Sequence, residues 1–204
     1  MFGPIEARVR GISMRLIGPV ARSRVTPNML TVVGLLLNVL TAVVIGGGYL
    51  FASGVLLLFA GIFDMADGAL ARVKNAASQF GDFLDATLDR LAEASIGLGL
   101  LWHAMARSDD LQVGLIYAVV LGSVMISYAR ARAEVLHLDC EVGLMARPER
   151  IVILAIGLIL AQATREFALT IILAVLCLST YYTVAQRIVH VYRITKGTQQ
   201  GVKG

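Results

Sequence analysis

The chain has 204 residues, of which 57% are hydrophobic, and its mean hydropathy of +0.77 is higher than that of ordinary soluble domains. The apolar runs are about twenty residues long and lack the alternation of membrane β-strands, which excludes a β-barrel and leaves an all-α integral membrane protein. The net charge of +4 is typical of basic loops at a membrane surface, so we expect no nucleic-acid partner.

The first 24 residues predict an amphipathic helix that lies on the membrane surface. Apolar side chains such as Val9, Ile12 and Leu16 recur at roughly helical spacing, and five arginines stand against a single acid, Glu6. A solvated basic leader is the alternative. At the other end of the chain, residues 195–204 are expected to form a short polar tail.

Between these ends, residues 25–194 predict a single membrane domain of six transmembrane helices. Pro27 marks the start of the first helix, because proline is favoured in the first helical turn, and the glycines at 46–48 end it. A second span runs from residue 50 into an aspartate-rich stretch. The other expected spans are residues 30–48, 82–106, 111–133, 151–163 and 167–192.

Positive charge is distributed unevenly among the connections between these spans. Of the 18 Lys and Arg residues, only Arg107 and Arg165 lie in the connections that follow odd-numbered spans. Because basic residues are retained on the cytosolic side of a membrane, this asymmetry predicts a multi-pass protein of the cell membrane. Both termini and the aspartate-rich stretch are expected at the cytosolic face.

Four aspartates lie between two long apolar runs, in pairs that each lie on one helix face. Asp64 and Asp67 are three residues apart, and Asp85 and Asp89 are four apart. Asp64 comes about 13 residues into its span, roughly 20 Å of helix, and so lies within the thickness of the membrane. Ionisable groups at that depth mark functional sites. Four carboxylates suit Mg²⁺ or Mn²⁺, and two such ions can clamp a pyrophosphate during displacement at phosphorus.

Residues near the aspartates add to this chemistry. Gly68 lets a ligand lie against the helix, and Arg72 offers a guanidinium fork to phosphate oxygens. Asp82 follows Gly81 and is expected to cap the N-terminus of the third span. Glu93 lies one turn after Asp89, and the sequence assigns it no role.

The whole stretch resembles a known family signature. The pattern D-x2-D-G-x2-A-R-x8-G-x3-D-x3-D is satisfied in full within residues 64–89, and it resembles the signature of the CDP-alcohol phosphatidyltransferases. Its fixed positions here are Asp64, Asp67, Gly68, Ala71, Arg72, Gly81, Asp85 and Asp89. The six-span layout extends the resemblance over nearly the whole chain.

The resemblance implies a reaction in which a CDP-linked lipid gives its phosphatidyl group to an alcohol and CMP leaves. It implies two divalent ions, Mg²⁺ or Mn²⁺, held by Asp64, Asp67, Asp85 and Asp89, with Asp89 as general base. The residues that it places at the CDP part are Asn28, Met29, Leu30, Thr31, Gly68, Arg72 and Ser78. It also implies a homodimer, and Gly97 and Gly99 would permit close helix contact either between chains or within one.

The identity of the acceptor alcohol depends on arginines outside the signature. Arg147 and Arg150 are three residues apart and share a helix face, and Arg130 and Arg187 lie toward the same end of their spans. Several guanidinium groups at one pocket suit a phosphorylated acceptor, because their forks match phosphate oxygens. Ordinary positive-inside anchors are the alternative.

A second resemblance narrows the acceptor. The sequence YARARAE at 128–134, followed by RPER at 147–150, resembles the phosphatidylinositol-phosphate synthases of actinobacteria and the similar archaeal enzymes. It implies a CDP-diacylglycerol-type lipid and inositol 1-phosphate as substrates, with Arg130, Arg147, Arg150 and Arg187 on the acceptor's phosphate. Glycerol-3-phosphate as acceptor and an archaeal ether-lipid donor stay open. A cation-coupled membrane carrier is a remote alternative from another class.

Overall fold

The computed structural model of the protein describes residues 26–73 and 78–201, except for the side chains of residues 65, 67–69, 71–73 and 197–201. Six helices make up most of this part: α2 (Pro27–Gly46), α3 (Leu50–Val73), α4 (Gln79–Ala106), α5 (Asp110–Val135), α6 (Arg147–Ala161) and α7 (Phe167–Gly201). The predicted all-α class is confirmed for the described residues. The predicted surface helix over residues 1–24 lies outside them.

Three of the described helices are long and apolar enough to cross a membrane, namely α2, α5 and α7 as far as Lys196. The other three depart from that pattern for identifiable reasons. The apolar part of α3 covers only Leu50–Asp64, and the first half of α4 carries the acidic residues of the site. α6 has 15 residues, about 22 Å of helix against roughly 30 Å of hydrocarbon. The helices therefore form an integral membrane protein.

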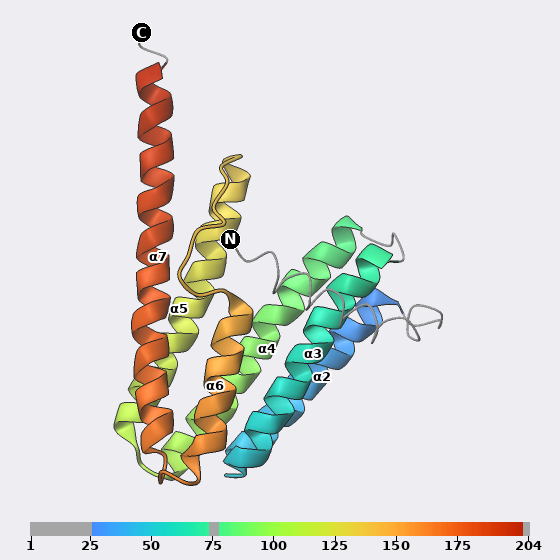
Figure 1. Ribbon diagram of the computed structural model, residues 1–204, viewed down its shortest axis with the longest axis vertical. Coiled ribbons are helices and arrows are strands. Elements are labelled where there is room, and N and C mark those ends of the chain that lie inside the picture. The colour runs from blue at the N-terminus through green and yellow to red at the C-terminus, as the bar shows by residue number, and fades with distance from the viewer. Residues whose placement is uncertain (1–25, 74–77, 202–204) are drawn as a thin grey trace, which may run out of the picture.

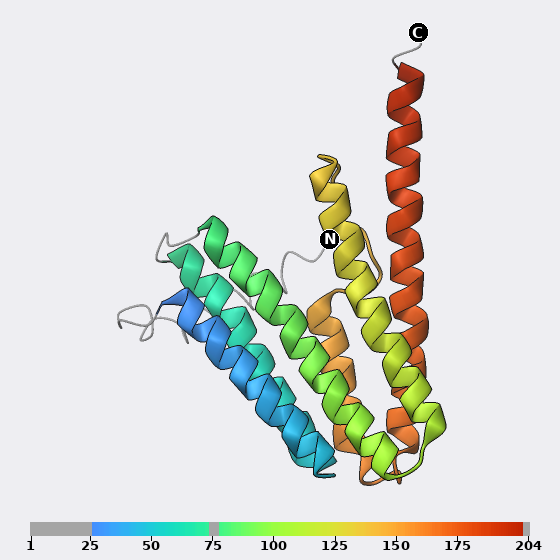
Figure 2. The ribbon, with the colours of Figure 1, turned by 180° about the vertical axis from the view of Figure 1, so that it is seen from behind.

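The helices pack as two groups of three (Figures 1 and 2). In the first group α2 contacts both α3 and α4, and in the second α7 contacts both α5 and α6. Contacts of α3 with α6 and of α4 with α5 join the groups. The groups meet at the end where the α2–α3, α4–α5 and α6–α7 connections turn, and they lean apart toward the other end. Toward that end, Arg147 at the start of α6 contacts Asp64 of α3 and Asp89 of α4.

Local sequence explains where the helices begin and end. Thr26 caps α2 by accepting a hydrogen bond from the backbone N–H of Met29 at 3.3 Å, and Pro27 follows in the first turn. Gly48 has a φ of +83°, a conformation that glycine adopts readily, and it makes the tight turn into α3. The prediction that Asp82 caps α4 is wrong. Ser78 accepts the bond from the N–H of Gly81 at 3.0 Å, and Asp82 lies in the first turn.

The last two helices also differ in extent from their predicted spans. α6 begins at Arg147, earlier than expected, because Pro148 fits its first turn and the Glu149 carboxylate accepts a 2.6 Å hydrogen bond from the N–H of Ala146. α7 continues to Gly201, so that most of the stretch expected as a polar tail is helical.

Two glycines of α4 let it approach its neighbouring helices closely. A Cβ on Gly99 of α4 would lie 2.8 Å from the Cα of Ala42 in α2, and a Cβ on Gly97 would meet the side chain of Val120 in α5. Both glycines thus serve packing within one chain. The apolar core around them contains fully buried side chains from five helices, Ile45, Leu57, Ile116, Leu158 and Leu173.

A buried carboxylate joins the connections at the closed end of the bundle. Glu166, only 8% exposed, contacts His103 Nε2 at 3.1 Å and Arg107 Nε at 3.0 Å. Glu166 immediately precedes α7, and its backbone has a positive φ of 68°. This contact ties the end of α4 to the start of α7.

The contact between α2 and α4 predicts different responses to the same substitution at two glycines. Gly99→Ala should destabilise the protein by about 1–3 kcal/mol, because the added methyl group has no room against Ala42. Gly114→Ala is the matched control, because a Cβ there meets nothing within 4 Å, and it should be neutral or slightly stabilising. Thermal unfolding of both variants in detergent measures the difference. Equal unfolding temperatures would contradict the close contact.

Candidate functional site

Helices α3 and α4 bring three of the four predicted metal ligands together. Asp64 lies on α3, and Asp85 and Asp89 lie one turn apart on α4. The side chains of Asp64 and Asp89 are each 17% exposed, whereas Asp85 is exposed. All three are close enough for their charges to interact. The fourth ligand, Asp67, is on α3 one turn after Asp64, and its side chain lies outside the described part.

A glycine that the sequence analysis did not single out makes room for Asp64. A Cβ on Gly34 of α2 would lie 2.9 Å from Oδ1 of Asp64, closer than side-chain atoms pack. The bare backbone of α2 therefore forms one wall of the aspartate cluster. Among many glycines in the apolar spans, nothing in the pattern around Gly34 marks this position, because the contact exists only once α2 and α3 have packed.

Arg147, at the start of α6, reaches across the gap between α3 and α4. Its Nη2 lies 3.0 Å from Oδ2 of Asp64, and its Nη1 lies 2.6 Å from Oδ1 of Asp89. The contact with Asp64 lacks hydrogen-bond geometry, so this Oδ2 is a buried oxygen with no hydrogen-bond partner in the described part. One guanidinium thus compensates two largely buried carboxylates.

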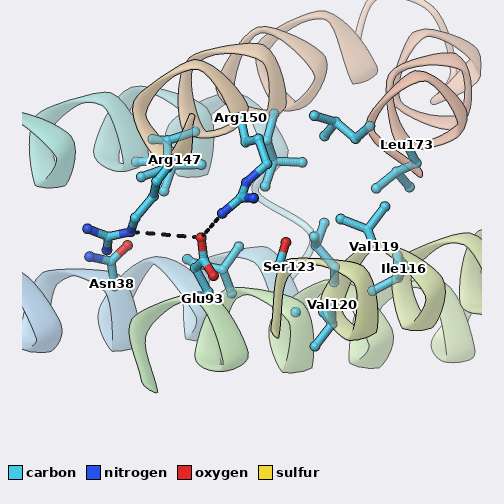
Figure 3. A pocket seen from close by; sticks show the side chains of 16 residues that line it. Asn38, Glu93, Ile116, Val119, Val120, Ser123, Arg147, Arg150 and Leu173 are labelled. Carbon is cyan, nitrogen blue, oxygen red and sulfur yellow. Dashed lines mark hydrogen bonds and ion pairs between the residues drawn. The ribbon is translucent and has the colours of Figure 1, made fainter. Parts of the chain in front are cut away.

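Arg150 lies one turn further along α6 and points to Glu93 of α4 (Figure 3). Its Nη2 donates a 2.7 Å hydrogen bond to Oε1 of Glu93, and the same oxygen lies 3.8 Å from Nε of Arg147. Arg150 is only 8% exposed, and its Nη1 is a buried donor without a partner among the described residues. The predicted pair Arg147 and Arg150 therefore does share one face, and Glu93 is the acid that the sequence left without a role.

A cavity of about 70 Å³ continues from these charges into the bundle. Asn38, Glu93, Ser123, Arg147 and Arg150 form its polar part, and apolar side chains from α3 to α7 line the rest. Arg147 belongs both to this polar part and to the aspartate cluster. The cavity therefore has a charged part next to the aspartates and an apolar part.

The other two predicted acceptor arginines lie further from the aspartates. Arg130 pairs with Glu134 at 2.8 Å and with Glu141 at 3.5 Å, and about half of its side chain is exposed. Arg187 donates to the carbonyl oxygens of Ile126 at 2.6 Å and Val142 at 3.0 Å. Arg187 is close enough to Arg130 and Arg150 for their charges to interact. Two of its donor groups nevertheless already serve the backbone.

The starts of α2 and α4 come together at the other side of the aspartates. A Cβ on Gly81 would lie 3.0 Å from Oγ of Ser78 and 3.4 Å from Oδ1 of Asn28, so these two predicted CDP-binding residues are neighbours. Met29 is exposed, Leu30 is half-buried, and the buried Thr31 donates its hydroxyl to the carbonyl of Pro27 at 3.2 Å. Gly68 and Arg72 lie on α3, outside the residues whose side chains are described.

The donor set fits a hard divalent cation. It consists of carboxylate oxygens from two helices, and Asp64 offers a buried Oδ2 with no hydrogen bond. Among the described side chains, no three His, Cys, Asp or Glu groups lie close enough to enclose an ion as they stand. The Arg147 guanidinium contacts both Asp64 and Asp89, and the side chain of Asp67 lies outside the described part.

Comparison with known proteins identifies the family. Residues 24–191 match the CDP-alcohol phosphatidyltransferase family. The chain belongs to this family. The predicted resemblance and the predicted enzyme class, a transferase, are therefore confirmed.

Three relatives are similar to this phosphatidyltransferase over most of their length. The phosphatidylinositol phosphate synthase of Mycobacteroides abscessus is 35% identical, with 91% of this chain and 86% of that protein covered. The archaetidylinositol phosphate synthase of Methanothermobacter thermautotrophicus is 32% identical over 92% and 94% of the two chains.

The third relative, the phosphatidylinositol phosphate synthase of Mycobacterium tuberculosis, has solved crystal structures. The structure with CDP-DAG bound superposes with a TM-score of 0.81 at 32% identity, covering 89% of this chain and 94% of that one. The structure in complex with manganese and citrate gives a TM-score of 0.79 at 31% identity, covering 88% of each chain. At this identity the likeness extends beyond the fold to the family.

The hydrogen bonds of Arg187 to two backbone carbonyls predict that this side chain has a structural role. Arg187→Gln should remove the hydrogen bonds that hold α7 to the carbonyls of Ile126 and Val142, and so loosen the connection between α5 and α6. Backbone amide exchange over residues 136–146 should become at least several times faster. Arg193→Gln, an exposed position on the same helix, is the control and should leave exchange unchanged. Unchanged exchange in Arg187→Gln would contradict this role.

Proposed function

We propose that the protein transfers a phosphatidyl group from a CDP-linked lipid to inositol 1-phosphate, releasing CMP and giving phosphatidylinositol phosphate. The observation that carries this proposal is the contact between the aspartates of α3 and α4 and the arginines of α6. Arg147 touches Asp64 and Asp89, and the neighbouring Arg150 keeps a buried donor without a partner in the described part. A neutral alcohol needs no such cations, whereas guanidinium groups fit phosphate oxygens. The names of the three relatives support the same class of acceptor.

The residues divide the work as follows. Asp89 accepts the proton of the acceptor hydroxyl as that oxygen bonds to the phosphorus of the phosphatidyl group. The bond between this phosphorus and the bridging oxygen of CMP breaks, and CMP leaves with the electron pair. Asp64, Asp67, Asp85 and Asp89 would hold two divalent ions, which supply charge neutralisation on the pyrophosphate and on the leaving CMP.

The two substrates approach this cluster from different sides. Asn28 and Ser78, at the starts of α2 and α4, lie on the side proposed for the CDP part, together with Met29, Leu30, Thr31, Gly68 and Arg72. Arg147 and Arg150 lie on the side of α6, where the acceptor phosphate is proposed to bind, with Arg130 and Arg187 further out. The hydroxyl and the pyrophosphate then meet at Asp89.

The proposal includes an arrangement in the membrane and an assembly. The six helices cross the cell membrane with the aspartates and both termini on the cytosolic side, which agrees with the distribution of Lys and Arg. The chain acts as a homodimer, as the family resemblance implies. Exposed apolar residues of α4 and α5, such as Leu98, Trp102 and Tyr117, offer surface to lipid and to a second copy.

An acceptor assay tests the proposed reaction. Purified protein with CDP-dioleoylglycerol and Mg²⁺ or Mn²⁺ should release CMP with inositol 1-phosphate, and not with glycerol-3-phosphate, serine or free inositol. The archaeal relative favours a parallel reaction with a CDP-linked ether lipid, which is the second donor to be assayed. Chelation of the metal should stop CMP release, and Asp89→Asn should slow it by about 100- to 10,000-fold. CMP release with glycerol-3-phosphate alone would refute inositol 1-phosphate as the acceptor. CMP release in the presence of the chelator would refute the requirement for a metal.

The role of Arg150 predicts a selective change in Michaelis constants. Arg150→Lys keeps a positive charge for Glu93 and loses the fork, so the KM for inositol 1-phosphate should rise about tenfold. The KM for the CDP-lipid should stay within about twofold, because the CDP part is proposed to bind on the other side of the aspartates. Arg132→Lys, exposed on α5, is the control. An equal rise in both constants for Arg150→Lys would count against a place at the acceptor phosphate.

A further inference from the structure

Glu93 connects the two arginines of α6 to the aspartate cluster, although it belongs to none of the family's signature positions. It lies one helical turn after Asp89 on α4, with 21% of its side chain exposed. Its Oε1 accepts the hydrogen bond of Arg150 at 2.7 Å and lies 3.8 Å from Nε of Arg147. One carboxylate oxygen thus lies within reach of both guanidinium groups.

Arg147 occupies oxygens that the proposed function assigns to a divalent ion. Its guanidinium contacts Oδ2 of Asp64 and Oδ1 of Asp89. A divalent ion and a guanidinium bound to the same carboxylate oxygens repel each other strongly, because both are cations at close range in a largely buried site. The two cations therefore cannot share these oxygens, and Arg147 has to leave them when the metal enters.

A displaced Arg147 needs another anion, because four-fifths of its side chain is buried. A buried charge without a partner costs several kcal/mol. Glu93 is the carboxylate at hand, because Nε of Arg147 is already 3.8 Å from it and has no hydrogen-bond partner among the described residues. A carboxylate has about four acceptor positions, so Glu93 can hold Arg147 and Arg150 together.

There is also space for the movement. Glu93, Arg147 and Arg150 all line the cavity of about 70 Å³, and its volume equals that of about five to seven water molecules by the usual measure of 10–15 Å³ each. The Arg147 side chain, which already borders this cavity, therefore has space beside it into which it can turn toward Glu93.

We propose that Glu93 is a positioning residue that receives Arg147 when the aspartates take up a divalent cation. This inference rests on the proposed function, which places the cation there. Glu93 then sets the affinity of the cluster for the metal, because it lowers the free-energy cost of removing Arg147. It also keeps both guanidinium groups side by side at the edge of the metal site, where the acceptor phosphate is proposed to bind, so metal binding prepares the acceptor side.

A double-mutant cycle on Mn²⁺ binding tests the inference without any turnover. Titration calorimetry on the purified protein, confirmed by the paramagnetic resonance signal of free Mn²⁺, gives the Kd. Arg147→Gln should bind Mn²⁺ about tenfold more tightly than the natural chain, because the competing cation is gone. Glu93→Gln should bind it about tenfold more weakly, because Arg147 has lost its second partner while Gln still accepts from Arg150.

The decisive value is the effect of Glu93→Gln in the Arg147→Gln background. If Glu93 acts through Arg147, the loss of affinity shrinks by threefold or more; a smaller difference between the backgrounds overturns the proposal. Asp82→Asn is the matched control. It removes a charge that interacts electrostatically with Asp85, and Asp82 makes no contact with Arg147 in the described structure. It should change the Kd by the same factor in both backgrounds.

Three further outcomes are possible, and the last of them separates the inference from the proposed function. If Glu93→Gln does not fold, Arg147→Gln alone decides, and Mn²⁺ affinity equal to or weaker than that of the natural chain overturns the proposal. If the natural chain binds no Mn²⁺ at all, the inference and the proposed metal site fall together. If it binds Mn²⁺ and releases CMP but shows no coupling between Glu93 and Arg147, only the inference falls.

Discussion

The compensation of buried carboxylates is the constraint on which the site depends. The side chains of Asp64 and Asp89 are largely buried, and buried carboxylates are costly unless a cation accompanies them. Arg147 supplies that cation from a third helix, α6. Next to it, Arg150 and Glu93 form a second ion pair. The polar residues of α3 and α4 are concentrated where the two groups of helices lean apart.

Close helix packing decides where these charges meet. Gly34 lets α2 pass beside the Asp64 carboxylate, Gly99 brings α4 against α2, and Gly54 brings α3 against Ala155 of α6. Each contact leaves no room for a Cβ, so the helix axes are held in a fixed relation. At the opposite end, the buried Glu166 joins α4 to α7 through His103 and Arg107. The helices are thereby joined at one end of the bundle, and the aspartates and arginines of the site lie toward the other end.

Membership of the CDP-alcohol phosphatidyltransferase family explains the aspartate signature. The signature aspartates and the basic pair of α6 are in direct contact, so the metal-binding and acceptor sides of the proposed reaction are electrostatically coupled. Occupation of one side changes the charge that the other side experiences. A cation that enters the cluster and a phosphate that approaches α6 therefore cannot act independently.

The sequence by itself determined the class of fold, the family and which four aspartates are candidate metal ligands, because helical periodicity and a fixed spacing are local properties. It also placed Arg147 and Arg150 on one helix face, since residues three apart must share it. Local pattern failed for the cap of α4, where Ser78 and not Asp82 binds the free N–H group. Only the tertiary structure decided which charges pair, that Gly34 borders Asp64, and that Glu93 faces both arginines. These contacts join residues tens of positions apart, and their distances follow from how the helices pack, which no spacing along one helix specifies.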